Sequence, residues 1–148
     1  MSEASTFESR IGKVACDADT FYSFITDIRN FRRFIPDGAA SNLIIEKESC
    51  SFSVSMLGNV KVHISEKLRA EKVVFSGNAL QVNDFQLIII IFKPGIGSTD
   101  IQIILSADMN PFLKMVAAEP INKLLEASIV EMEKFRDWND IKEHNQFL

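Results

Sequence analysis

Few side chains in this sequence are of types that catalyse reactions or hold metal ions. The two histidines, His63 and His144, lie far apart, and the two cysteines are Cys16 and Cys50. Neither a Ser-His-Asp nor a Cys-His arrangement follows from these positions, and the four residues do not have the spacing of a closed zinc site. The Gly-Ile-Gly segment at 95–97 is typical of a hairpin turn rather than of a phosphate-binding loop. The sequence therefore predicts no catalytic residue, no metal and no cofactor.

Glu66 is the polar residue that the strand pattern directs toward the apolar side. Alternation along 60–70 puts Glu66 on the same face as Val62 and Ile64. A lone buried carboxylate is costly unless it is paired, protonated or close to water. Two interpretations stay open. Glu66 is either a solvated strand end or a structural ion pair, or it makes a polar contact inside a cavity, with an acid/base role as the smaller part of the second case.

The positive charges show one cluster and no basic excess. Arg29, Arg32 and Arg33 fall on one face of a short helix expected within 17–35. They form either a solvated basic face or an attractor for an anionic headgroup or phosphate near a cavity mouth. The whole chain has 16 basic and 20 acidic residues, a formal net charge of −4, which does not favour nucleic acid as a partner.

The length of 148 residues fits one domain spanning 1–148. The sequence lacks the basic-then-apolar start of a signal peptide, and its longest apolar run, 87–92, is far too short to span a bilayer. Two cysteines without a disulfide pattern are typical of a reducing compartment, so we expect a cytoplasmic protein. We expect residues 139–148 to form a loosely held tail.

Two periodicities divide the chain into elements. A strand is expected at 6–14, and apolar residues at spacings of three and four within 17–35 then predict two short helices, with Asp17 as N-cap. Six strand-like segments follow between 41 and 109. In "SCSFSVSM", residues 49–56, serine alternates with apolar residues, which predicts one face in water and one hidden face.

The C-terminal part has the pattern of a covering helix. Asn110 and Pro111 resemble a cap followed by proline at the first helical position. Pro120 removes a helical hydrogen bond, so we expect a short helix, a break, and a long helix from about 120 to 138. Hairpin-length connections predict an antiparallel sheet, and the apolar stripe of the long helix would cover one face of it.

The segment "FESRIGKVACDADTFYSFITDIRNFRRFIP" resembles the opening of the START-like superfamily, also called SRPBCC. The similar features are a strand, an acidic cap, aromatic residues on a short helix, and "TD" before a second short helix ending in "FIP". "ADMNPFLKMVAAEPINKLLEASIVEMEKF", residues 107–135, is similar to the last strand and closing helix of that superfamily. The superfamily includes the birch-pollen-allergen fold and the polyketide cyclase/coenzyme Q-binding proteins, and the resemblance covers nearly the whole chain.

The resemblance implies an α+β helix-grip fold. A curved seven-stranded antiparallel sheet would surround a long C-terminal helix, with two short helices after the first strand. It also implies a cavity between sheet and helix for a hydrophobic ligand. The superfamily includes lipid carriers, cyclases, chaperone co-activators and hydrolases, so fold alone does not choose among them.

We expect binding or transport of a lipid, an isoprenoid or a polyketide-like molecule, with no catalysis evident. A cyclase-like or hydrolase-like enzyme and an interaction module without a small ligand are the alternatives. Large phenylalanine and isoleucine side chains would leave the cavity filled if they pack into it. The candidate ligand-binding residues are Phe31, Phe34, Phe52, Val54, Met56, Val62, Ile64, Glu66, Phe75, Leu87, Ile89, Ile101, Ile103, Leu125 and Ile129.

The strand "QLIIIIF", residues 86–92, is apolar on both faces. Ile88, Ile90 and Phe92 share the face that would be wet in a sheet covered on one side. We expect either a homodimer contact, cover by another segment of the chain, or tolerated exposure. Ile44 and Ile104 are candidates to extend the same outer patch.

Overall fold

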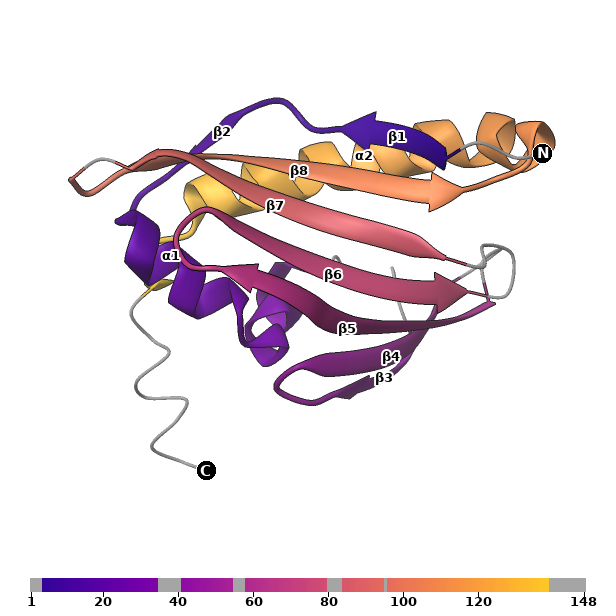
Figure 1. Ribbon diagram of the computed structural model, residues 1–148, viewed down its shortest axis with the longest axis horizontal. Helices are drawn as coiled ribbons and strands as arrows, with labels where there is room; N and C mark the ends of the chain where they lie inside the picture. The colour runs from indigo at the N-terminus through magenta and orange to yellow at the C-terminus, as the bar shows by residue number, and fades with distance from the viewer. Residues whose placement is uncertain (1–3, 35–40, 55–57, 80–83, 95, 139–148) are drawn as a thin grey trace.

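The computed structural model describes residues 4–34, 41–54, 58–79, 84–94 and 96–138 (Figure 1). Within them a strand pair, two short helices, a run of strands and a long helix follow in the predicted order. The helices are α1 (Ala18–Ile25), the 3-10 helix η1 (Ile28–Phe34) and α2 (Pro111–Lys134). The strands are β1 (Ala4–Glu8), β2 (Gly12–Val14), β3 (Ser41–Ile45), β4 (Ser49–Val54), β5 (Gly58–Leu68), β6 (Lys72–Ala79), β7 (Phe85–Pro94) and β8 (Thr99–Asp108).

All the strands belong to one curved antiparallel sheet, in the order β1-β8-β7-β6-β5-β4-β3. Both β1 and β2 pair with β8, so the segment expected as one strand over 6–14 is two, and the sheet has eight strands rather than seven. The ladder is interrupted at Ser9, where the backbone N–H donates to the Ile103 carbonyl and the Ser9 hydroxyl oxygen accepts from the Ile103 N–H at 2.9 Å. This side-chain bond replaces one rung of the ladder and lets the chain bend between the two short strands.

The two short helices lie where the helical spacing predicted them. Asp17 occupies the N-cap position of α1, but its side chain makes no cap hydrogen bond. Its Oδ1 instead accepts from the Gly97 N–H at 2.6 Å, which ties the loop between β7 and β8 to the start of α1. Between the helices, the buried Asn30 amide donates to the Phe24 carbonyl at 2.9 Å and satisfies the end of α1.

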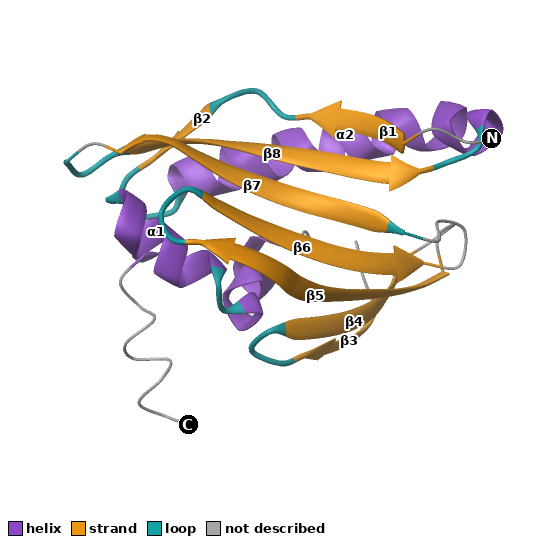
Figure 2. Cartoon of the chain, in the orientation of Figure 1, coloured by secondary structure: helices purple, strands orange, loops and turns teal. Residues whose placement is uncertain are grey.

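The long helix α2 lies behind the sheet and covers one of its faces (Figure 2). The cap at Asn110 is confirmed, because its Oδ1 accepts from the Leu113 N–H at 2.8 Å. The break expected at Pro120 is wrong: α2 is continuous, with Pro120 inside it. Pro120 lacks the N–H for one helical hydrogen bond, its ring lies on the exposed side of α2, and packing on either side holds the helix together.

The core lies between α2 and the face of the sheet that α2 covers, which we call the inner face. At the α1 end, Gly12 of β2 allows α2 to approach closely, because a Cβ there would lie 2.7 Å from Ile129 Cγ2. Trp138, expected at the end of the long helix, comes just after it and is almost completely buried. Its ring packs edge-on against Phe24 and Phe135 at centroid distances of 4.9 and 4.8 Å.

Candidate functional site

Strand β4, the "SCSFSVSM" segment, shows how the two faces of the sheet differ. Cys50 and Phe52 pack against the hydrophobic core on the inner face. Ser49 and Ser51 lie opposite His63 and Lys61 on the outer face, which is the side away from α2. The alternation predicted for this segment is therefore confirmed over its described part. Met56 and the side chains of Phe34 and Val54, all in the predicted lining, lie outside the described residues.

Six residues of the predicted lining are fully buried. They belong to the hydrophobic core, and their relative exposure is at most 5%. Such side chains are held by contacts with one another and with the helices, so they present little free surface to a ligand. The six residues are Phe75, Ile89, Ile101, Ile103, Leu125 and Ile129.

Five other residues of the predicted lining are only partly buried although they pack against the core. They are Phe31, Phe52, Val62, Ile64 and Leu87. Phe31, from η1, meets Phe75 edge-on at a centroid distance of 5.4 Å, so η1 packs against the inner face. Apolar side chains that face the core yet keep contact with water mark the part of the inner face that α2 and η1 leave incompletely covered.

Further partly exposed apolar residues extend this incompletely covered region beyond the predicted lining. Phe85 and Leu105 come from β7 and β8, and Leu113 and Ile121 come from the first half of α2. Sequence reasoning missed Leu113 because it expected the covering helix to begin only near Pro120, whereas Ile121 lies within the expected helix but was not among the predicted lining residues. Gly77, a glycine inside β6, was the sequence signal that could have indicated Phe85, because a glycine within a strand often marks a close approach. Phe85 pairs with Gly77, and its Cζ lies 2.8 Å from the position that a Gly77 Cβ would take.

Glu66 is not on the inner face, and the alternation that placed it beside Val62 and Ile64 is wrong. Ile64 pairs with Phe75 but Glu66 pairs with Val74, so β5 has one extra residue, Ser65, at this point. This β-bulge reverses the faces of the residues that follow. The Glu66 carboxylate is about half exposed and lies 3.0 Å from Lys72 Nζ, which matches the interpretation of a solvated ion pair.

The three arginines of the second helix do not act as one basic face. Arg29 Nη2 donates to Asp27 Oδ2 at 2.6 Å, and Arg29 Nε donates to Asp27 Oδ1 at 2.8 Å. Asp27 is almost completely buried, so this bidentate pair closes the turn between α1 and η1. Arg32 is exposed, and the side chain of Arg33 lies outside the described residues.

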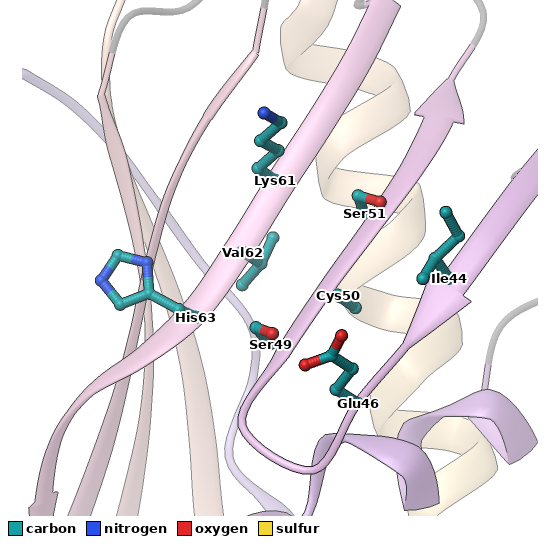
Figure 3. Close-up of a pocket in the computed structure, with 8 residues that line it drawn as sticks. All are labelled: Ile44, Glu46, Ser49, Cys50, Ser51, Lys61, Val62 and His63. Carbon is teal, nitrogen blue, oxygen red and sulfur yellow. The ribbon is translucent and has the colours of Figure 1, made fainter.

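A small hollow of about 340 Å³ lies on β3, β4 and β5 (Figure 3). By the strand register, its outer-face walls come from Ile44, Ser51 and Lys61, together with Ser49 and His63. Cys50 of β4 and Val62 of β5 also line the hollow, although their side chains point to the inner face. A lysine, an imidazole, a carboxylate from Glu46 and two hydroxyls contribute to this hollow beside its apolar residues.

The described residues hold neither a gathering of three or more His, Cys, Asp or Glu side chains placed to bind a metal ion nor a helix long and apolar enough to cross a membrane. Both cysteines are free. Burial raises the pKa of the Cys16 thiol to about 12, and burial also raises the pKa of Cys50. Both are therefore thiols rather than thiolates at neutral pH, which disfavours nucleophilic chemistry at either sulfur.

The sheet curved against a long C-terminal helix, with two short helices after the first strands, is the START-like helix-grip fold. The sequence matches no model of a known protein family, and no curated protein matches it by sequence. Solved structures share the fold. A norcoclaurine synthase point mutant from Thalictrum flavum, bound to a transition-state analogue, has a TM-score of 0.70 at 14% identity and covers 98% of each chain.

Two further structures are similar along most of this chain. Norcoclaurine synthase from Thalictrum flavum in complex with dopamine and hydroxybenzaldehyde has a TM-score of 0.67 at 14% identity, covering 90% of this chain and 86% of that one. A START superfamily protein from Mycobacterium smegmatis has a TM-score of 0.63 at 15% identity, covering 87% and 97%. At these identities the likeness concerns the fold.

Proposed function

We propose that this protein binds a hydrophobic small molecule, such as a lipid, an isoprenoid or a polyketide-like compound, between the inner face of the sheet and α2. The observation that carries the proposal is the set of partly exposed apolar side chains on the inner face. Phe52, Val62, Ile64 and Leu87 from the strands and Ile121 from α2 all pack against the core without being fully covered.

Apolar surface left in contact with water on a core-facing side is unfavourable by about 25 cal/mol per Å². At the α1 end of the core, Ile89 of the sheet and Ile129 of α2 are both fully buried, so the core is closed there. A bound apolar molecule would complete the packing around Val62 and Leu87 in the way that Ile129 of α2 completes it at Gly12 of β2.

A complex of a protein with this fold supports small-molecule binding, and that protein is itself a synthase. Norcoclaurine synthase has been solved with dopamine and hydroxybenzaldehyde bound. The enzyme alternative for the present chain rested on Glu66 as an inward acid, and Glu66 lies on the outer face with Lys72. We therefore propose binding or transport without assigning a reaction.

Neighbouring positions on β5 give a matched test. Val62 is partly buried on the inner face, whereas Lys61 is exposed on the outer face. Val62→Trp would place an indole in the proposed ligand space, and Lys61→Trp would place it in solvent. We expect Val62→Trp to weaken binding of a fluorescent fatty acid by tenfold or more, about 1.4 kcal/mol, and Lys61→Trp to bind like the wild type.

Native mass spectrometry and solvent extraction of freshly purified protein identify the ligand itself. Absence of bound ligand in repeated preparations, together with no thermal shift across a panel of lipids and isoprenoids, would refute the proposal. Equal binding by the two tryptophan variants would show that the probe sits elsewhere. Circular dichroism of both variants confirms that each is folded before binding is compared.

A further inference from the structure

The outer face of the sheet carries a continuous apolar patch. Val74, Ile88 and Ile104 lie side by side in one row across β6, β7 and β8, because Val74 pairs with Ile88 and Ile88 pairs with Ile104. Ile90 and Phe92 continue the patch along β7, since residues two and four positions further on share the face of Ile88. We call these five residues the outer patch.

The outer patch is separate from the core. The core-facing residues on these strands are the intervening ones, such as Ile89, which pairs with Val73 and Ile103. Val74 is buried, and the other four members are partly exposed. The outer face of a sheet covered on one side normally carries polar side chains, so five adjacent apolar ones indicate a surface that is covered in the functional protein. Ile44, on β3, lies outside the outer patch, with Ser51 of β4 between it and Lys61 of β5.

We propose that a second copy of this chain covers the outer patch, forming a two-fold symmetric dimer in which the two sheets pack face to face. The patch is self-complementary about an axis along β7. Such an axis sets Ile88, Ile90 and Phe92 against their own counterparts and Val74 against the partner's Ile104, because β6 and β8 flank β7 on opposite sides. The polar neighbours match too, since Ser76 meets the partner's Ser106.

The area of the outer face is large enough for a second copy of this chain. Five strands, from β5 to β1, span about 24 Å at 4.8 Å per strand, and eight to ten residues span about 27–34 Å along them. The product, roughly 650–800 Å², is the upper bound for this curved face, and stable interfaces bury about 600–1,000 Å² per partner.

Charged residues at the rim are largely neutralised within each chain. The outer-face charges include the pairs Glu66–Lys72, at 3.0 Å, and Lys13–Asp100, at 3.2 Å. Glu8 of β1 pairs with Ile104, so it extends the row of Val74, Ile88 and Ile104 by one strand. In the dimer Glu8 would face the partner's Glu66–Lys72 pair, where the partner's Lys72 supplies the opposite charge. Two copies can therefore approach face to face without bringing unpaired like charges into the centre of the contact.

Two outer-face isoleucines give a matched test of the dimer. We expect light scattering after size exclusion to give the wild type a mass twice the 16.7 kDa of one chain. Ile88→Lys should reduce the mass to that of one chain, because it places two like charges together on the axis. Ile44→Lys, on the same face but outside the patch, should remain dimeric. A monomeric wild type at about 100 µM, a concentration that fills any site with a micromolar Kd, overturns the proposal.

A cross-linking variant tests the geometry without relying on loss of structure. Ile90→Cys places one thiol from each copy next to the axis, so oxidation should yield a covalent dimer, whereas Ile44→Cys should stay monomeric under denaturing electrophoresis. The native thiols give little background because Cys16 is buried and Cys50 is partly buried on the inner face. Equal cross-linking of the two variants, or none by Ile90→Cys, contradicts the proposed axis.

Discussion

At the scale of single residues, a network of charged groups joins the segment between β1 and β2 to the closing helix. Arg10 Nη2 and Nη1 donate to Glu133 Oε1 and Oε2 at 2.6 and 3.1 Å, and the Lys13 N–H donates to Glu133 Oε2 at 3.0 Å. Arg10 Nε also donates to Glu126 Oε1 at 2.9 Å. Hydrogen bonds from Arg10, and then from the Lys13 amide, hold the pKa of the Glu133 carboxyl at about 2, against an ordinary value of 4.5.

This depressed pKa predicts an acid-dependent part of the stability. Because the folded pKa of Glu133 is below the unfolded value, its contribution is complete above about pH 4.5 and is lost as the pH falls toward 2. Glu133→Gln should therefore lower the Tm at pH 7 and flatten the fall in Tm between pH 4.5 and pH 2. Glu131→Gln, two residues away and exposed, is the control and should keep the slope of the wild type.

The sequence predicted the position of a side chain on its helix or strand more reliably than the group that the side chain contacts. Asp17 was predicted as a cap and stands at the cap position, but its carboxylate binds the Gly97 amide from a loop 80 residues away. Periodicity depends only on residues that are near in the sequence. It therefore carries no information about a partner that the tertiary fold brings close. The same holds for Arg10, whose two acidic partners lie 116 and 123 residues further along the chain.

At the scale of elements, two of the errors of the sequence analysis have one cause. The bulge at Ser65 depends on how β5 pairs with β6, and the continuity of α2 through Pro120 depends on what packs on either side of it. Local propensity and alternation carry neither kind of information. The prediction of Glu66 as a lining residue and the prediction of a helix break both rested on the isolated segment.

The contact between β2 and α2 is the element-scale feature most open to test. Gly12→Ala would place a Cβ 2.7 Å from Ile129 Cγ2, so either the helix or the strand must move. We expect a loss of about 1–3 kcal/mol in the free energy of unfolding, measured by denaturant titration. Ile129→Leu removes the Cγ2 methyl at nearly constant volume, so the double variant should be less destabilised than the sum of the single ones. Strict additivity would show that this contact does not limit the packing.

At the scale of the whole molecule, one sheet would serve two partners on opposite faces. The proposed ligand faces Val62 and Leu87, and the proposed second copy faces Ile88 and Ile104, so neighbouring residues of β7 belong to different interactions. Ile88→Lys should therefore bind the fluorescent fatty acid with a Kd within about twofold of the wild type even as a monomer. Val62→Trp should remain a dimer. A folded Ile88→Lys variant that loses the probe would show that ligand binding requires the assembled dimer.

The burial of Trp138 determines what intrinsic fluorescence can report. It is the only tryptophan in the chain, and it is enclosed by Phe21, Phe24 and Phe135 at the α1 end of the core. Its emission should be blue-shifted in the folded protein and should move to longer wavelength when the end of α2 separates from α1. The proposed ligand space around Val62 and Leu87 is lined by other side chains, so a ligand that fills it should leave this emission nearly unchanged. A fluorescence titration that followed Trp138 alone would then show no change in emission while a ligand filled the proposed space.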